Sequence, residues 1–408
     1  MIDIKFIREN SKLVLEKAQQ KGYFPNIEKL LEVDQSRRRL IEEVDKLRQD
    51  RKKAAEKRDE KEGLRIKGEL KTKEEKLEKL NEEFYVLIRE VPNLAKDDVK
   101  VGKDEQENEI LRQVGKRPNF DFTPKDHLEL GVGLDLIDTD TASKISGPRF
   151  GYIKNELALL EFALIKYILD ILTKEDFIPI IPPVIINKNI AQNLGYPEYE
   201  TGEGYTLSDD QYLVGTAEHS IVPIHMNQTF QQKDLPRRYA GFSTAFRREA
   251  GSYGKDTKGI FRVHQFDKVE MVSYVMPEDE DKEHEYLLSL EEKIVGGLEL
   301  PYQVIKQCTG DLGFPTARKY DIETWIPSQE KYRETHSAST NSDFQSRRLN
   351  IKYNAKGQTG YVYILNATAV AVGRILIAIL ENYQQKDGSI LVPIVLQNYV
   401  GFNKIPRN

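Results

Sequence analysis

The sequence contains one cysteine and no long apolar run, and each of these shortages excludes a class of protein. Cys308 has no second cysteine with which to form an internal disulfide or a cysteine-cluster zinc site, so we expect no structural zinc. No apolar stretch approaches the roughly 18 residues that a membrane-spanning helix needs, and charged residues interrupt the N-terminus where a signal peptide has its apolar core. We therefore expect a cytoplasmic protein with no membrane partner.

Two common phosphate-binding motifs are missing as well. The sequence has neither a GxxxxGKS/T P-loop nor a GxGxxG motif within a predicted strand, which excludes the Walker and Rossmann modes of nucleotide binding. An overall excess of positive charge is also absent, since the net charge is −5 and the pI is near 5.9. Residues 51–80 are an exception, with 12 Lys or Arg against 8 Asp or Glu, so we expect any RNA-binding surface there.

Apolar residues repeat at alternating spacings of three and four on both sides of residues 63–68, which predicts two antiparallel helices. Gly63 and Gly68 are predicted to mark the tip of this hairpin, and Pro92 to end its second helix. Arms of about 30 residues would extend roughly 45 Å. From the pattern alone, the hairpin is a spacer or a dimerisation element. The predicted seam contains Val33, Leu40, Val44, Leu47 and Ala54, and then Leu70, Leu77, Leu80, Phe84, Leu87 and Val91.

The 408 residues are enough for more than one domain. Residues 99–123 are polar and lack periodicity, so we interpret them as a linker between an N-terminal domain, residues 1–98, and a C-terminal domain, residues 124–408. In the C-terminal domain we predict a helix at 155–172, a proline-broken strand at 177–186 and a last helix at about 367–384. Strand pairs outnumber helices there, which indicates an α+β fold with an antiparallel sheet flanked by helices.

The most informative segment is FRREAGSYGKDTKGIFRVHQFDKVE, residues 246–270, which is typical of two strands joined by a glycine-rich loop. Arg247 and Glu249 are two residues apart, so an extended chain places them on the same side. Because side chains alternate along a strand, a second row of cationic, aromatic and acidic side chains lies on one face of the returning strand. Such a surface suits a ligand with a phosphate and an amino group. The loop contains Gly251, Gly254, Asp256 and Gly259, and the row contains Arg262, His264, Phe266, Lys268 and Glu270.

Residues 246–270 resemble motif 2 of class II aminoacyl-tRNA synthetases, in the form found in seryl-tRNA synthetases. Further segments resemble the same family in the same order along essentially the whole chain. They are the opening MIDIKFIREN, ISGPRFGYIKNELALLEFALIKYILDIL, the triplet Thr216-Ala217-Glu218, KYRETHSASTNSDFQSRRLNI and AVAVGRILIAILENYQ. Several long motifs in one order make this resemblance far more specific than a single FRxE would be.

The resemblance implies an ATP-dependent ligase that works in two steps. Serine would be activated as seryl-adenylate and transferred to the 3′ end of serine tRNA, with selenocysteine tRNA as a second substrate expected for the family. Arg247 and Arg374 would be the catalytic residues, at the α- and γ-phosphates. The implied ATP-binding residues are Arg247, Arg248, Glu249, Val263, Phe266, Glu334, Thr335, His336, Ser337 and Arg374, and of these Glu334 and Ser337 would hold magnesium.

The resemblance also implies a pocket for the ammonium group, the carboxylate and the hydroxyl of serine. Its residues would be Thr216, Ala217, Glu218, Arg247, Glu270, Asn366 and Thr368. The sequence departs from the family at two places near this pocket. Asn366-Ala367-Thr368-Ala369 stands where NGSG is usual, and Thr335-His336 replaces a common Ile-Ser pair. These changes put the detailed contacts there in question.

The implied partners are serine tRNA, bound through the hairpin, and a second copy of the chain, bound through the helix at 155–172 and the strand at 177–186. The alternative for that segment is a core helix with no dimer. Two other functions stay open: a synthetase paralogue that passes an amino acid to a carrier protein, and an inactive RNA-binding derivative. The hairpin argues against the first, and the retention of Arg247, Glu249, Glu270 and Arg374 argues against the second.

Overall fold

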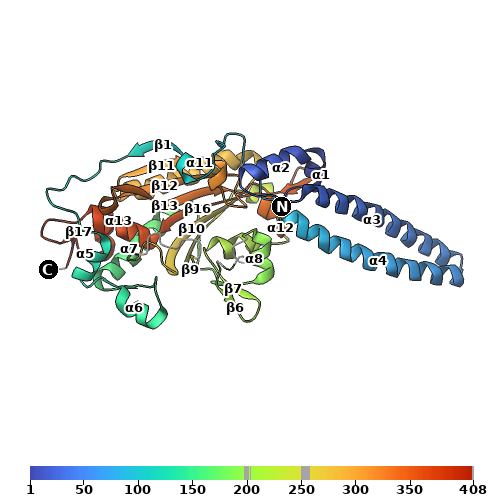
Figure 1. Ribbon diagram of the computed structural model, residues 1–408, viewed down its shortest axis with the longest axis horizontal. Helices are drawn as coiled ribbons and strands as arrows, with labels where there is room; N and C mark the ends of the chain where they lie inside the picture. Colours follow the sequence, from blue (N-terminus) through green and yellow to red (C-terminus); the bar gives the residue numbers. More distant parts are fainter. Residues whose placement is uncertain (197–201, 203, 250–257, 407–408) are drawn as a thin grey trace. The chain divides into compact units, whose positions relative to one another are not determined.

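The computed structural model describes residues 1–196, 202, 204–249 and 258–406, and the chain forms two compact units, residues 1–94 and 95–408 (Figure 1). The predicted domain limits, with a linker at 99–123, stay a prediction. Within that range, residues 109–114 form a strand of the large sheet. Nearly all of its side chains are exposed, so the apolar and polar alternation that reveals a half-buried strand is missing from its sequence.

The first unit contains two short helices and a helical hairpin. The short helices are α1 (Ile4–Glu9) and α2 (Ser11–Gln20). As predicted, two long helices, α3 (Ile27–Glu56) and α4 (Glu60–Arg89), run side by side in opposite directions (Figure 1). The end of α4 before Pro92 is also confirmed.

The predicted tip of the hairpin is wrong. The chain turns at residues 57–59, and Gly63 and Gly68 lie inside α4. The side chain of Asp59 accepts a hydrogen bond from the N–H of Glu62 at 3.1 Å, so it caps the helix before either glycine is reached. A glycine within an exposed helix costs only about 1 kcal/mol relative to alanine, which a 30-residue helix tolerates.

The seam between α3 and α4 is mainly apolar. Val44, Ala54, Ile66 and Leu70 form a buried cluster. Arg37 enters the seam nearer the base, where its guanidinium carbon lies 4.7 Å from the ring centroid of Phe84. Its Nε also donates to Asn81 Oδ1 at 2.6 Å, so the cation is accommodated by stacking and by a hydrogen bond.

The second unit is built on an eight-stranded sheet with the order β1-β11-β12-β13-β16-β10-β9-β4. All neighbouring strands are antiparallel except β4 and β9, which confirms the α+β prediction. The strands are β1 (Glu109–Val114), β4 (Ile178–Ile180), β9 (Arg237–Phe246), β10 (Gln265–Val275), β11 (Tyr302–Lys306), β12 (Arg318–Ile326), β13 (Lys331–Thr340) and β16 (Tyr363–Ala371).

Three helices cover this sheet and bury the main core: α7 (Asn155–Lys174), α11 (Glu280–Gly297) and α13 (Val372–Asn382). The predicted helix at 155–172 is confirmed as α7. The predicted start of the last helix is wrong, because residues 363–371 form β16 and the helix begins at Val372. A strand buried on both faces has a continuous apolar run, which periodicity cannot distinguish from a buried helix.

Smaller elements complete this unit, and no helix in the described residues is long and apolar enough to cross a bilayer. The helices are α5 (His127–Gly133), α6 (Thr139–Ser146), α8 (Lys188–Leu194), α10 (Glu218–Ile221), α12 (Phe344–Leu349) and α14 (Ile394–Val400). The strands are β2 (Ile137–Asp138), β3 (Tyr152–Ile153), β5 (Ile185–Asn187), β6 (Thr206–Leu207), β7 (Gln211–Leu213), β8 (Thr229–Gln231), β14 (Lys352–Ala355), β15 (Gln358–Tyr361), β17 (Ile390–Leu391) and β18 (Lys404–Ile405).

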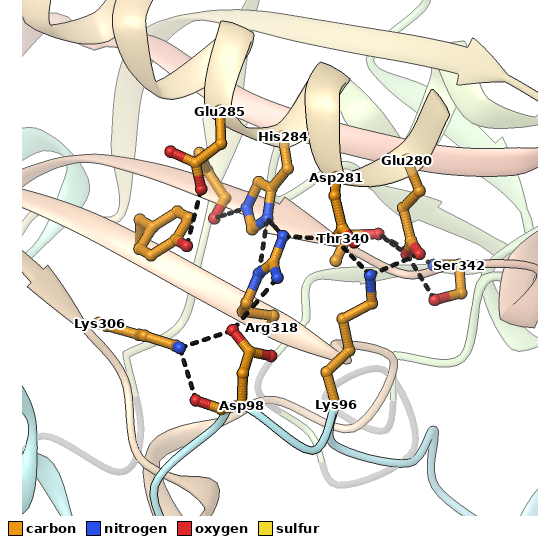
Figure 2. Close-up of polar contacts among 12 residues, drawn as sticks. Lys96, Asp98, Glu280, Asp281, His284, Glu285, Lys306, Arg318, Thr340 and Ser342 are labelled. Carbon is orange, nitrogen blue, oxygen red and sulfur yellow. Dashed lines mark hydrogen bonds and ion pairs between the residues drawn. The ribbon is translucent and has the colours of Figure 1, made fainter. Parts of the chain in front are cut away.

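A polar network fastens the first residues of the second unit to its sheet and to α11 (Figure 2). Lys96 Nζ lies 2.6 Å from Asp281 Oδ1 on α11. The carboxylate of Asp98 pairs with Lys306 of β11 at 2.7 Å and with Arg318 of β12 at 3.3 Å. Arg318 Nη2 also donates to Asp281 Oδ1 at 2.8 Å. Each carboxylate thus meets two cations, which fixes residues 96–98 within this unit.

Candidate active site

Two adjoining cavities lie on the sheet where β9, β10, β12, β13 and β16 meet, with volumes of about 160 and 290 Å³. Arg247, at the end of β9, and Lys268, on β10, line both of them. A ligand in one cavity would therefore share a cationic wall with a ligand in the other. The arrangement can bring two negatively charged groups together, provided that the shared cations balance their charge.

Most of the residues predicted to bind ATP line the smaller cavity. The guanidinium carbon of Arg247 lies 5.5 Å from the ring centroid of Phe266. On the opposite wall, Arg374 Nη1 donates to the carbonyl oxygen of Glu334 at 2.9 Å. The two arginines predicted to be catalytic thus stand on different walls of one cavity. The predicted residues that line it are Arg247, Glu249, Val263, Phe266, Glu334, Thr335, Ser337 and Arg374, joined by Thr368 of the predicted serine set.

Four residues predicted for serine, Thr216, Glu218, Glu270 and Asn366, line the larger cavity together with Arg247. Thr216 Oγ1 donates to Glu270 Oε2 at 3.3 Å. Two buried carboxyl groups and a hydroxyl therefore converge, as binding of an ammonium group requires.

Two β-bulges give the cavity its lining. Glu334 and Ser337 are three residues apart, so on a regular strand they would face opposite sides of the sheet. In β13, Ile322 pairs with His336 and Glu323 pairs with Glu334, which leaves Thr335 as an extra residue. Both Glu334 and Ser337 consequently line the smaller cavity. A second bulge in β16, at Ala369, likewise turns Thr368 and Ala371 to this cavity.

The charges around Glu334 keep it ionised. Burial favours the neutral acid, but Lys319, Arg374 and Arg247 hold the pKa of Glu334 well below its usual value. Its carboxylate lies 3.4 Å from Arg374 Nη1. The smaller cavity thus has an anionic group among cations, which is the composition of sites that bind phosphates together with a divalent cation.

Glu218 has the opposite environment. Its Oε1 accepts hydrogen bonds from Tyr196 at 2.5 Å and from Gln345 at 3.0 Å. Burial, and then the nearby charge of Glu270, raise the pKa of Glu218 to about 7. Lys268 forms an ion pair with Glu270, and its Nζ donates to Thr216 Oγ1 at 3.2 Å. Beside Glu218 and Glu270 the ion pair to Lys268 engages only one of the two carboxyl groups, so a ligand ammonium group would supply a partner for the other.

Three predicted site residues do not line either cavity. Ala217 is buried, and the guanidinium carbon of Arg248 lies 5.4 Å from the ring centroid of Tyr205. His336 is buried too, with Nδ1 2.9 Å from Thr335 Oγ1, and burial lowers its pKa to about 3. His336 and Ser337 are consecutive residues in the regular part of β13, so the imidazole lies on the face opposite Ser337. Their contacts with substrate stay predictions, and Gly251, Gly254 and Asp256 of the predicted loop lie outside the described residues.

Sequence reasoning missed several residues of the site. Strand alternation places Lys268 on the same face as Glu270, but the sequence gives no sign of the ion pair between them. Lys319 comes from β12, outside every motif recognised in the sequence, and lines both cavities. Phe261 lies between two arginines, with its ring centroid 4.3 Å from the guanidinium carbon of Arg333 and 5.0 Å from that of Arg374. No sequence signal identifies such pairs, since folding brings them together.

Comparison with known proteins supports this organisation over the whole chain. The model of the seryl-tRNA synthetase N-terminal domain matches residues 1–95, and that of the class II tRNA synthetase core domain (G, H, P, S and T) matches residues 205–383. The serine–tRNA ligase of Dictyoglomus thermophilum is 42% identical, with 99% of each chain covered. The crystal structure of seryl-tRNA synthetase from Pyrococcus horikoshii complexed with ATP has a TM-score of 0.93 and 37% identity, with 99% of each chain covered. The chain therefore belongs to the seryl-tRNA synthetase family of class II aminoacyl-tRNA synthetases.

Proposed function

We infer that this protein is a serine–tRNA ligase, which activates serine with ATP and transfers the seryl group to the 3′ end of serine tRNA. One observation carries the proposal: residues expected to bind ATP and residues expected to bind serine line two cavities that share Arg247 and Lys268. This arrangement allows the serine carboxylate to meet the α-phosphate. A cytoplasmic location follows from this substrate, and selenocysteine tRNA is a second proposed acceptor.

In the activation step, a carboxylate oxygen of serine attacks the α-phosphorus of ATP. A bond forms between this oxygen and the phosphorus, the bond from the α-phosphorus to the bridging oxygen breaks, and pyrophosphate leaves. We assign Arg247 to the α-phosphate and the serine carboxylate, since it lines both cavities. Arg374 is assigned to the γ-phosphate, and Glu249, Phe266 and the main chain of Val263 to the adenine ring. The two fixed guanidinium groups would stabilise the negative charge that builds up on the phosphate oxygens, without reorganisation during the step.

Serine recognition is assigned to the larger cavity. Glu218 and Glu270, with Thr216, would hold the ammonium group, and Asn366 the hydroxyl, together with Thr368 from the adjoining smaller cavity. A site built to bond a hydroxyl rejects alanine, because its buried polar groups would be left without partners.

Magnesium is proposed as a partner of ATP. In the described residues, no group of three or more His, Cys, Asp or Glu side chains is arranged to hold a metal. Magnesium usually takes only one or two protein ligands and completes its shell with water and substrate phosphates. Glu334, ionised among cations, and Ser337, on the same wall, fit that requirement. When bound, the metal would neutralise phosphate charge.

The hairpin is the tRNA-binding arm of this family, and we propose that its basic excess at residues 51–80 contacts the tRNA backbone. We also propose a homodimer through the region of α7 and β4. Phe162 on α7 is 68% exposed and Ile181, just after β4, is 82% exposed. Large apolar side chains exposed together suggest a surface that a second copy covers.

Pyrophosphate exchange tests the proposal. Purified protein with magnesium should incorporate labelled pyrophosphate into ATP when serine is supplied, and not with other amino acids. Arg374→Ala should reduce this exchange by about 100-fold or more, because a preorganised cation at the triphosphate is lost. Arg112→Ala removes an arginine that pairs with Glu292 beyond both cavities and should change the exchange less than about twofold. Absence of serine-dependent exchange in the unmodified protein would refute the assignment.

A further inference from the structure

His127 lies at the start of α5, outside both cavities, and is only 3% exposed. Both of its ring nitrogens have partners. Nδ1 is 3.3 Å from Glu381 Oε1, which also accepts the main-chain N–H of His127 at 3.0 Å. Nε2 accepts a hydrogen bond from the main-chain N–H of Ile260 at 3.3 Å. One neutral tautomer, with the proton on Nδ1, satisfies all three contacts.

One partner of His127, Ile260, lines the smaller cavity, and the other, Glu381, lies on the helix that carries Arg374. Glu381 lies on α13 about two turns beyond Arg374. It is fully buried, and its second oxygen accepts the N–H of Ser328 at 2.9 Å, so it is held firmly. Ile260 begins the segment 260–263, whose four residues all line the cavity. The imidazole therefore joins the helix that carries Arg374 to the segment that faces it.

Phe261 connects the contact between His127 and Ile260 to the arginines of the site. Its ring lies between the guanidinium groups of Arg333 and Arg374, at 4.3 and 5.0 Å. A guanidinium group that stacks on an aromatic face takes its position from that face. The main-chain position of Ile260 fixes the adjacent Phe261, and Phe261 in turn limits where Arg374 can stand.

Gly259 shows how closely the imidazole approaches this segment. A Cβ atom at this position would lie 2.0 Å from His127 Nε2, and the φ of Gly259 is +70°. Only glycine allows this approach without displacing the ring. The neighbouring pair of Lys258 with Asp126 adds a second contact between the same segment and the start of α5.

We propose that His127 is a positioning residue for ATP: by accepting the N–H of Ile260 while bound to Glu381, it sets Phe261 and hence Arg374 at the triphosphate end of the cavity. This proposal rests on the proposed function. It assigns to His127 no contact with substrate and no proton transfer.

Two substitutions separate the hydrogen bond to Ile260 from the rest of the side chain. His127→Asn places an amide near the position of Nδ1, so it can donate to Glu381 but cannot reach Ile260. His127→Gln extends to the position of Nε2 and can accept the N–H of Ile260. We expect His127→Asn to raise the Michaelis constant for ATP in serine-dependent exchange about tenfold, which is typical of a buried donor left unpaired. The Michaelis constant for serine should be unchanged, and His127→Gln should restore most of the loss.

His225→Asn is the matched control. Both ring nitrogens of His225 also have partners, Gln228 Oε1 at 2.8 Å and Tyr239 OH at 2.9 Å, but the residue lines neither cavity. It should lower the thermal unfolding temperature without a selective effect on ATP. An unchanged Michaelis constant for ATP in His127→Asn would overturn the proposal, as would equal losses for ATP and serine that His127→Gln does not rescue. Failure of the unmodified protein to exchange pyrophosphate would instead refute the proposed function.

Discussion

Glu218 is a buried carboxyl group that a bound serine would need in its ionised form. Tyr196 and Gln345 donate hydrogen bonds to it, yet burial and the charge of Glu270 raise its pKa to about 7. The ammonium group of serine would supply the positive charge that this carboxylate lacks. If Glu218 binds this ammonium group, as we propose, binding of serine is coupled to release of a proton from Glu218.

We expect the Michaelis constant for serine to rise as the pH falls below about 7, because the carboxyl group is neutral below its pKa and ionised above it. Well below that value the rise should approach about tenfold per pH unit. Pyrophosphate exchange at varied serine, between about pH 6 and about pH 8, measures this dependence. Glu218→Gln should bind serine weakly at every pH, with the Michaelis constant for ATP as a parallel control. A constant value for serine in the unmodified protein would contradict the prediction.

For individual residues, the sequence predicted those cavity-lining residues that lie inside continuous motifs. Arg247, Glu249 and Glu270 fall within one strand-loop-strand segment and all line the larger cavity, although Arg247 and Glu249 follow the end of β9 and Glu249 has a φ of +51°. Lys319 and His127 could not be predicted, because their partners are distant along the chain and meet them only through packing.

The hairpin of α3 and α4 is an element with its own core, since its buried seam involves only residues of the first unit. This independence makes its role in tRNA binding separable from the chemistry. We expect deletion of residues 27–92 to leave serine-dependent exchange within about threefold, because both cavities lie in the second unit. Charging of serine tRNA should fall by at least about 100-fold, since several phosphate contacts are lost together.

The loss of charging is measured as labelled serine attached to tRNA and retained on filters. Serine-dependent exchange by the same preparation is the control. Undiminished charging by the shortened protein would contradict the prediction. Acylation of a carrier protein in place of tRNA would favour the paralogue alternative.

Element types were predicted better than element limits. The seam of the hairpin is visible as a heptad-like pattern, but its tip is set by the capping of Asp59, and neither glycine in α4 signals it. Likewise, the apolar run from residue 363 to residue 382 conceals a change from β16 to α13. Burial on both faces removes the periodicity that would have revealed this change.

At the scale of the whole molecule, the exposed apolar side chains near α7 suggest an interface with the apolar surface of a second copy. We expect Phe162→Glu to convert a dimer of 47.1 kDa chains to monomers, because a charge would be buried without a partner in the interface. Analytical ultracentrifugation at several concentrations measures this. Phe24→Glu is the matched control, since Phe24 is 78% exposed and belongs to the first unit. A monomeric unmodified protein would rule out the dimer.

The extra residue at Thr335 makes the length of β13 as important as its composition. If β13 became a regular strand without losing a residue, one of the two oxygen-bearing side chains would turn toward the opposite face. The two intervening residues can therefore differ, as they do in this chain with threonine and histidine, so long as the bulge is kept.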